Sequence, residues 1–281
     1  MKRGFRVLAF AAAAALALFA VPASAGDHGA SSYLALGDSY AFAFNPLVFA
    51  AGGATDPRNF PGYTDVVGRA LDLTLTNAAC PGETSGSFIS GSLPDNGCQA
   101  YRSGYPLHTA YLGSQLAYAV KFLKSHDHVD LVTVQIGGND VLTLQALCNG
   151  DPTCIVTGLP AVEAQMAANL TTIYSSIRSL AHYRHTIVAV SYFAFNYNDA
   201  NNLAIVTSLD AVEAAVALRF HVRVANVLGA FALASAPSGI PCLAGLQVQL
   251  PTGGCDIHPS AAGHAVYARA VLAALPHQKT D

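Results

Sequence analysis

The chain has 281 residues, of which 52% are hydrophobic and 11% are charged, and its formal net charge is −3. A chain of this length and apolar content can bury a sizeable core, which excludes intrinsic disorder as its class. Its charged residues form no basic run, so we expect no nucleic-acid partner.

The first 25 residues have the pattern of a secretory signal peptide. Residues 2–6 include three basic side chains, an uncharged apolar run covers 7–21, and small residues at 23–25 form a cleavage signal. The apolar run is shorter than the roughly 18 residues of a membrane span, although an uncleaved anchor is the alternative. We therefore expect a secreted protein whose mature chain, residues 26–281, is a single domain without an integral membrane span.

Five β-branched, apolar runs alternate along the chain with helical patterns. The predicted strands cover 33–36, 73–75, 130–136, 186–192 and 221–227, and the predicted helices cover 63–71, 116–125, 161–180, 208–220 and 260–275. This alternation is typical of a parallel sheet covered by helices on both faces. Two stretches, 43–62 and 80–113, read as loops. Because ligands bind beyond the carboxyl ends of such strands, we expect the functional site there.

Export would place the cysteines in an oxidising environment. Six cysteines allow many connectivities, and the sequence alone does not choose among them. The simplest scheme pairs neighbours along the chain and closes three short loops: Cys80 with Cys98, Cys148 with Cys154, and Cys242 with Cys255. No two cysteines have the C-x-x-C spacing of a zinc site, so we expect no metal.

The first predicted strand leads into Gly37-Asp38-Ser39-Tyr40. A serine at this place lies on a tight turn into a helix, where Gly37 permits unusual backbone dihedrals. The free N–H groups of the helix start can stabilise a developing oxyanion. The motif therefore suits a nucleophile, and an ordinary helix cap is the alternative.

Three further motifs lie at comparable places. Asn139 follows two glycines after a strand and has an amide that can donate to an oxyanion, and Gly82 can present a backbone N–H. Ordinary turns are the alternative for both. His258 stands before Pro259 and can take a proton from a serine and return it to a leaving group. A structural histidine is the alternative there.

Together and in this order, the four motifs resemble those of the SGNH hydrolases, also called GDSL esterases and lipases. The resemblance covers roughly residues 32–275, with Tyr40 in place of the usual leucine. The cysteine spacing and the stretch 77–84 are most similar to secreted actinobacterial-type lipases. The resemblance implies a flavodoxin-like three-layer α/β/α sandwich with a five-stranded parallel sheet, which agrees with the five predicted strands. It implies no metal or organic cofactor.

The resemblance also implies a role for each motif. Ser39 attacks an ester carbonyl and forms an acyl-enzyme, and His258 is the general base and then the general acid. The Ser39 N–H, the Gly82 N–H and the Asn139 side chain form the oxyanion hole. Asp38 is expected to brace its loop.

One departure from the family pattern concerns the acid that orients the histidine. The family usually has this acid three residues before the histidine, where this chain has Cys255. Asp256 stands two residues before His258 and can orient the imidazole through its carboxylate, as in a triad, or through its main-chain carbonyl, as in a dyad. A helix-entry cap is the alternative for Asp256.

The apolar loop 42–49 beside Ser39 can form the wall of an acyl pocket, or it can be a buried packing loop. The chain has no tryptophan, whereas sugar esterases of the family are expected to be Trp-rich around the site. We therefore expect a monomeric lipase or carboxylesterase that acts on small-molecule or lipid esters. A phospholipase, a carbohydrate acetylesterase and a catalytically silent SGNH-like binding protein are the alternatives.

Overall fold

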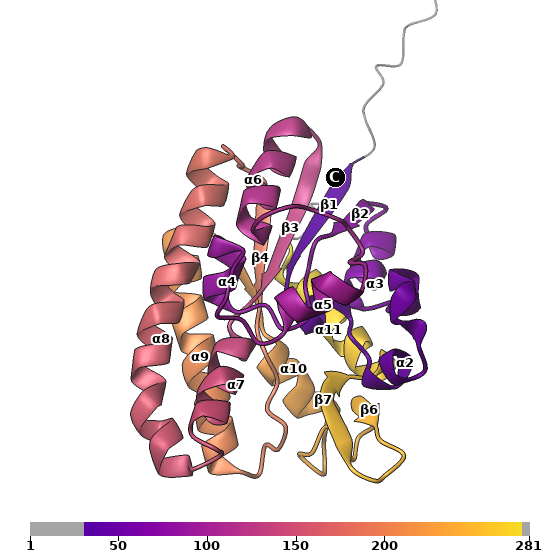
Figure 1. The fold of residues 1–281 in the computed structure, drawn as a ribbon, viewed down its shortest axis with the longest axis vertical. Coiled ribbons are helices and arrows are strands. Elements are labelled where there is room, and N and C mark those ends of the chain that lie inside the picture. The colour runs from indigo at the N-terminus through magenta and orange to yellow at the C-terminus, as the bar shows by residue number, and fades with distance from the viewer. Residues whose placement is uncertain (1–30, 277–281) are drawn as a thin grey trace, which may run out of the picture.

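The computed structural model describes residues 31–276, so the predicted signal peptide lies outside the described residues. A parallel sheet with strand order β2-β1-β3-β4-β5 forms the centre of the molecule (Figure 1). Its strands are β1 (Ser32–Gly37), β2 (Thr74–Asn77), β3 (Val129–Gln135), β4 (Thr186–Val190) and β5 (Arg223–Ala225). The predicted five-stranded parallel α/β fold is confirmed.

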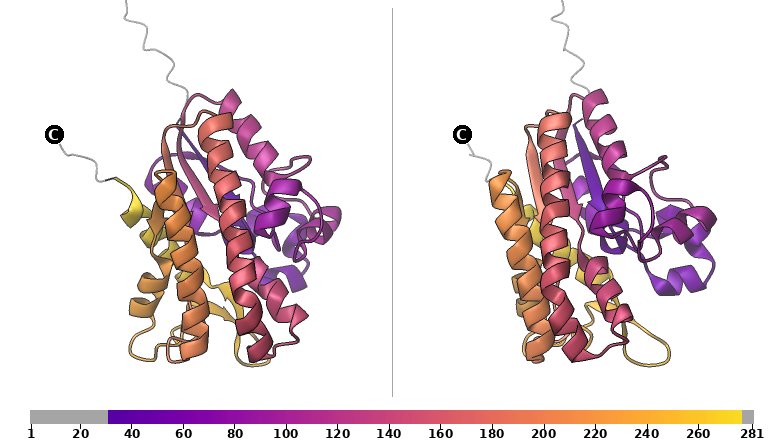
Figure 2. Two further views of the ribbon diagram at one scale, coloured as in Figure 1. Left: turned by 90° about the vertical axis from the view of Figure 1, so that its left-hand side faces the viewer. Right: turned by 60° about the vertical axis from the view of Figure 1, so that its left-hand side comes forward.

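Helices cover both faces of the sheet, and Figure 2 shows α8 and α9 side by side on one of them. One layer contains α3 (Tyr63–Ala70), α10 (Val227–Ala234) and α11 (Ala261–Ala274). The opposite layer contains α4 (Ser85–Ser90), α6 (Gln115–Ser125), α8 (Pro152–Ser175) and α9 (Ala200–Arg219). A π-helical turn, Ser176–Leu180, extends α8. Four further helices lie in the connections after β1, β2 and β3: α1 (Ser39–Phe42), α2 (Pro46–Ala50), α5 (Cys98–Gly104) and α7 (Gly138–Leu147).

Strand β1 shows why the predicted strands are continuous apolar runs. Tyr33 and Ala35 are fully buried on the side of α3 and α11, and Leu34 and Leu36 are fully buried on the side of α6 and α8. Successive side chains of a strand point to opposite faces, so a sheet covered on both faces needs an apolar residue at every position.

The structure corrects several predicted boundaries. Helix α8 begins at Pro152 rather than at 161, because the turns before Pro160 stay helical and pack against α7. Helix α9 begins at Ala200 rather than at 208, where the Asp199 side chain caps it. The last predicted strand ends at Ala225, because the side chain of Asn226 caps α10. The two predicted loops contain the short helices α2, α4 and α5.

An antiparallel hairpin of β6 (Gln247–Gln249) and β7 (Cys255–Pro259) stands apart from the main sheet. The sequence places His258 on a turn just before the helix predicted at 260–275. The helix is confirmed as α11, which Ser260 caps, but His258 lies on strand β7 rather than on a turn. Strands this short and polar do not show the period of a strand in the sequence. The hairpin matters because it carries the C-terminal end of the candidate site.

Three disulfides join Cys80 to Cys98, Cys148 to Cys154 and Cys242 to Cys255. The predicted pairing of neighbours is confirmed.

Within residues 31–276, one helix is long and apolar enough to cross a membrane by length and composition alone. This helix is α9, which packs against α8 and against strands β4 and β5. On its inner face, Val206, Leu209, Val216 and Ala217 are buried.

Candidate active site

Ser39 is the first residue of α1, the helix that follows strand β1. A Cβ atom at Gly37, whose φ is +144°, would lie 2.2 Å from the carbonyl oxygen of Gln135 on β3. Only glycine fits there, and the chain turns sharply into α1, whose Tyr40 N–H donates to the Asp38 carboxylate at 2.9 Å. Ser39 is thereby held at the carboxyl ends of the strands. At this point the connection from β1 leads to one side of the sheet and the connection from β3 leads to the other. Ligands usually bind at such a point.

His258 reaches Ser39 from the other end of the chain. Its Nε2 lies 2.9 Å from the Ser39 Oγ, and its Nδ1 hydrogen-bonds to the Asp256 carboxylate. The His258 backbone N–H donates to the same carboxylate oxygen at 3.0 Å, whereas the Asp256 carbonyl accepts from Gln247 Nε2 at 2.9 Å. Of the two predicted ways to orient the imidazole, the structure contains the carboxylate contact.

The charge of Asp256 follows from these contacts. Its partial burial raises the pKa of the carboxyl group, but the hydrogen bonds from the His258 side chain and backbone outweigh burial and bring the pKa below its usual value. The carboxylate is therefore ionised at neutral pH. An ionised partner on Nδ1 selects the tautomer whose Nε2 can accept the serine proton.

Gly82 and Asn139 lie beside Ser39 in the same cleft. A Cβ atom at Gly82, whose φ is +83°, would lie 2.4 Å from the carbonyl oxygen of Asn96. The Asn139 amide nitrogen donates to the Glu83 carbonyl at 2.9 Å, and its oxygen accepts from Asn96 Nδ2 at 2.8 Å. The second hydrogen of that amide nitrogen points to no described partner. In residues 31–276 the N–H groups of Ser39 and Gly82 likewise make no hydrogen bond.

Sequence reasoning missed Gln115, which connects two of the motifs. Its side chain accepts from the Gly37 N–H at 2.5 Å and donates to the Gly37 carbonyl at 3.0 Å and to Glu83 at 3.1 Å. Burial raises the pKa of Glu83 to about 7. Gln115 begins an ordinary amphipathic helix, so no local pattern marks it.

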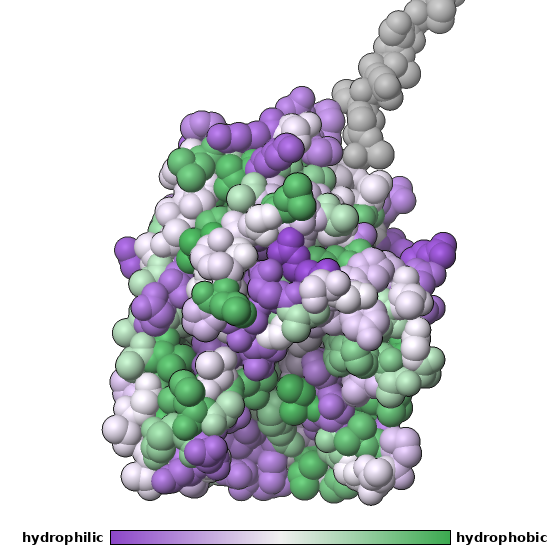
Figure 3. Space-filling view, in the orientation of Figure 1, coloured by the Kyte–Doolittle hydropathy of each residue, from purple (hydrophilic) through white to green (hydrophobic). Residues whose placement is uncertain are grey.

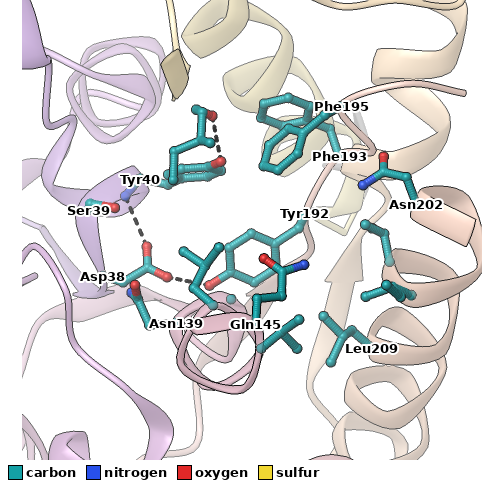
Figure 4. A pocket seen from close by; sticks show the side chains of 16 residues that line it. Asp38, Ser39, Tyr40, Asn139, Gln145, Tyr192, Phe193, Phe195, Asn202 and Leu209 are labelled. Carbon is teal, nitrogen blue, oxygen red and sulfur yellow. Dashed lines mark hydrogen bonds between the residues drawn. The ribbon is translucent and has the colours of Figure 1, made fainter. Parts of the chain in front are cut away.

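Tyr192, which follows β4, was also missed. Its hydroxyl donates to the Asp38 carboxylate at 2.5 Å, and Figure 4 shows this bond together with the bond from the Tyr40 N–H. Burial raises the pKa of Asp38 to about 7. Asp38 accordingly braces the turn before Ser39, as the resemblance implies.

Two hollows meet at Ser39. One is an open cleft of about 410 Å³ that contains His258 and Gly82. Phe44 and Phe49 of the predicted apolar loop line this cleft, while Phe42 of the same loop is fully buried in the core. Apolar residues are prominent on the lower half of this face of the molecule (Figure 3).

The other hollow is a more enclosed, mainly apolar cavity beneath Ser39, drawn in Figure 4. Its walls come from α7, α9 and the segment after β4, and they include the side chains of Leu142, Phe193, Ile205, Val206 and Leu209. The sequence did not predict this cavity, because its walls come from segments far apart in the chain.

Potential metal ligands cluster at one place in the part of the chain that the structure describes. These residues are Cys80, Glu83 and Cys98. The two cysteines form a disulfide, so they offer no thiolate to a metal ion.

The fold resembles those of solved ester-cleaving enzymes. Phospholipase A1 from Streptomyces albidoflavus NA297 is 20% identical, with a TM-score of 0.58 over 88% of this chain and 100% of that chain. The extracellular lipase from Streptomyces rimosus is 21% identical, with a TM-score of 0.58 over the same shares. An acetylxylan esterase from Geobacillus stearothermophilus is 17% identical, with a TM-score of 0.55 over 88% of this chain and 95% of that chain.

No curated protein sequence matches the chain. A sequence profile of the GDSL-like lipase/acylhydrolase family matches residues 35–266. This match covers most of the chain and contains all four motifs, from the turn at Ser39 to His258. The chain therefore belongs to the GDSL-like lipase/acylhydrolase family of ester hydrolases.

Proposed function

We propose that this protein is a serine carboxylic-ester hydrolase of the lipase or esterase type, with Ser39 as its nucleophile. The observation that carries the proposal is the continuous line of contacts from Ser39 Oγ through the His258 imidazole to the Asp256 carboxylate. A nucleophile, a base in hydrogen-bond reach and an acid that orients the base are the parts that acyl transfer needs.

In the proposed first half-reaction, Ser39 Oγ forms a bond to the ester carbonyl carbon while its proton moves to His258 Nε2. The carbonyl electron pair moves onto oxygen, which the N–H groups of Ser39 and Gly82 and the amide of Asn139 stabilise. When the carbonyl re-forms, the C–O bond to the alcohol breaks, and His258 gives its proton to the departing oxygen. The products are the free alcohol and an acyl group on Ser39.

In the second half-reaction, water replaces the alcohol. His258 takes a proton from the water, the resulting hydroxide attacks the acyl carbon, and the proton returns to Ser39 as the carboxylic acid leaves. The Asp256 carboxylate stabilises the imidazolium in both halves. The reaction uses only groups of this chain, the ester and water.

The two hollows suggest how an ester is oriented. His258 must protonate the alcohol, so the alcohol belongs in the open cleft, where the imidazole lies beside the Phe44 ring with centroids 5.0 Å apart. The acyl group then takes the other direction from Ser39, into the apolar cavity between α7 and α9, whose volume of about 70 Å³ holds a short acyl group or the first carbons of a longer chain. The rings of Phe44 and Phe49 in the open cleft favour lipid or simple carboxylic esters over acetylated polysaccharide.

Secretion is part of the proposal. Residues 1–25 would direct export, and residues 26–281 would be the mature single-domain enzyme. Three disulfides support an oxidising destination, because such bonds persist outside the reducing cytosol.

The test is a chain-length series of nitrophenyl esters from acetyl to palmitoyl, hydrolysed by the purified oxidised protein and by Ser39→Ala. We expect turnover that Ser39→Ala abolishes without lowering the melting temperature. The acyl length of maximal kcat/KM distinguishes a lipase from an acetylesterase. A folded wild-type protein that cleaves none of these esters, or a Ser39→Ala variant that retains the activity, would contradict the proposal.

A further inference from the structure

A third hollow lies at the sheet edge opposite Ser39. It has a volume of about 440 Å³ and is lined mainly by cationic and imidazole side chains: Arg178, Arg184, Arg219, Arg223, His185 and His221. Thr186 and Arg223, which begin β4 and β5, belong to its wall. Because Ser39 and Asn139 follow the carboxyl ends of strands, this basic hollow is separate from the proposed active site.

Arg178 makes the floor of the basic hollow rigid. Four of its N–H groups donate to backbone carbonyls at 2.8–3.1 Å, those of Tyr183, His185, Phe220 and His221. These carbonyls belong to the segments that follow α8 and α9, so one guanidinium fixes both segments. The hollow is thus a built feature of the fold rather than a gap between mobile loops.

The other three arginines are exposed, and none of them forms an ion pair with a residue of 31–276. Arg223 donates to the carbonyl of Ala274 at 3.2 Å, and the Arg219 guanidinium lies 5.9 Å from the centre of the Phe220 ring. Among the residues that the structure describes, no carboxylate lines the hollow. Within residues 31–276, the two ion pairs are Arg58 with Asp56 and His258 with Asp256, both elsewhere.

This concentration of positive charge is unusual for the chain. The net charge is −3 and the whole sequence has 14 lysines and arginines, yet four of them line one hollow. Arginines at helix C-termini stabilise the helix dipole, which accounts for Arg178 and Arg219 in the last turns of their helices. Arg184 and Arg223 lie outside helices, and the dipole does not account for them.

We propose that the basic hollow binds a small soluble anion with more than one phosphate group, of about the size of pyrophosphate or larger. The planar guanidinium fork matches the oxygens of a phosphate, and several forks around one concave site favour a multivalent anion. The volume lies in the range of small-molecule sites, about 300–1,000 Å³. The four arginines surround one concave site, so their positive fields add at the place where the anion would lie.

The test is calorimetric titration of the purified protein with pyrophosphate, at low and at moderate sodium chloride. We expect saturable binding at one site that weakens as salt screens the arginines. The double variant Arg184→Gln/Arg223→Gln should weaken binding by at least about tenfold, because each change removes charge-assisted hydrogen bonds. The matched double variant Arg69→Gln/Lys121→Gln removes two exposed charges elsewhere and should bind as the wild type does.

Both double variants should keep the wild-type melting temperature and esterase kcat/KM, because the hollow is remote from Ser39. Arg178 is left unchanged, because its loss would loosen the floor. Absence of saturable pyrophosphate binding, or an equal loss in both double variants, would overturn the proposal. Sedimentation with phosphatidylglycerol vesicles without pyrophosphate binding would also overturn it, because it would indicate attraction to a charged surface rather than binding of one anion in the hollow.

Discussion

The hydroxyl of Tyr40 donates a hydrogen bond of 2.6 Å to the carbonyl of Ile257, so the residue after Ser39 is bonded to the residue before His258. The Tyr40 ring also meets the His258 imidazole edge-on, with centroids 5.5 Å apart. The family usually has leucine at this position, which cannot donate. In this chain, the segments of the proposed nucleophile and base therefore have a direct bond of their own.

Tyr40→Phe should show what this bond contributes. Loss of one hydrogen bond should lower the free energy of unfolding by about 1 kcal/mol in urea denaturation. It should lower kcat several-fold with little change in KM, because the distance between Ser39 and His258 becomes less fixed. Tyr40→Leu also loses the ring contact with His258, so it should lower both the free energy of unfolding and kcat further than Tyr40→Phe does. Wild-type stability and kcat in Tyr40→Phe would refute this role.

Asp256→Asn tests the carboxylate contact with His258. An amide in this place stabilises the wrong imidazole tautomer and cannot balance an imidazolium, so kcat should fall by about 10⁴. Gln247→Ala removes only the hydrogen bond to the Asp256 carbonyl, so it should lower kcat far less. If Asp256→Asn loses only a few-fold while Gln247→Ala loses as much, the main-chain carbonyl is the orienting group.

Asn139→Ala removes a proposed oxyanion donor and should lower kcat by about 10²–10³ with little change in KM. Asn139 also holds its neighbours, so Asn96→Ala is the matched control. That variant removes the hydrogen bond to the Asn139 oxygen but leaves the donating amide in place. Equal losses in the two variants would mean that the Asn139 side chain supports the loop and does not act on the oxyanion.

The disulfides should differ in their effect on activity. Cys242 and Cys255 are 13 positions apart, and replacing both with serine should cost about 3 kcal/mol of unfolding free energy. This change should also lower kcat, because Cys255 precedes Asp256 on β7. Replacing Cys148 and Cys154, at the junction of α7 and α8, should lower stability with a smaller effect on kcat. A larger loss of kcat in the variant without Cys148 and Cys154 than in the variant without Cys242 and Cys255 would contradict this prediction.

His264 should make the protein sensitive to acid. Burial, helped by the charge of His258, lowers its pKa from 6.5 to about 3, so the unfolded chain binds a proton below pH 6.5 that the folded chain does not. The contribution to stability is complete above pH 6.5 and declines by up to about 1.4 kcal/mol per pH unit as pH falls toward 3. His264→Gln keeps an acceptor for the Tyr63 N–H at this position but cannot take up the proton. The free energy of unfolding of this variant, measured by urea denaturation, should fall less between pH 7 and pH 4 than that of the wild type. An equal fall in both proteins would contradict the prediction.

Much of the site could be predicted because each of its motifs is recognisable from a short stretch of sequence. Ser39, Gly82 and Asn139 each stand just after a strand, on turns whose glycines are visible in the sequence. The parallel topology then brings them together without further information. Neighbour pairing of the cysteines was equally accessible, because short loops close at little entropic cost.

The parts that escaped prediction depend on long-range contacts. Gln115 becomes important only because α6 packs beneath the turn at Gly37. Tyr192 reaches Asp38 across 154 positions. The strand that carries His258 depends on pairing with a three-residue partner, which has no periodicity of its own. The choice between the carboxylate and the carbonyl of Asp256 depends on this same hairpin.

The hydrogen bond between Ser39 and His258 joins positions 219 residues apart. Under the proposed mechanism, a chain whose C-terminal hairpin has not yet docked has its nucleophile and its oxyanion donors but no base to activate the serine. Ester cleavage then begins only when that hairpin docks, so an incompletely folded chain is inert.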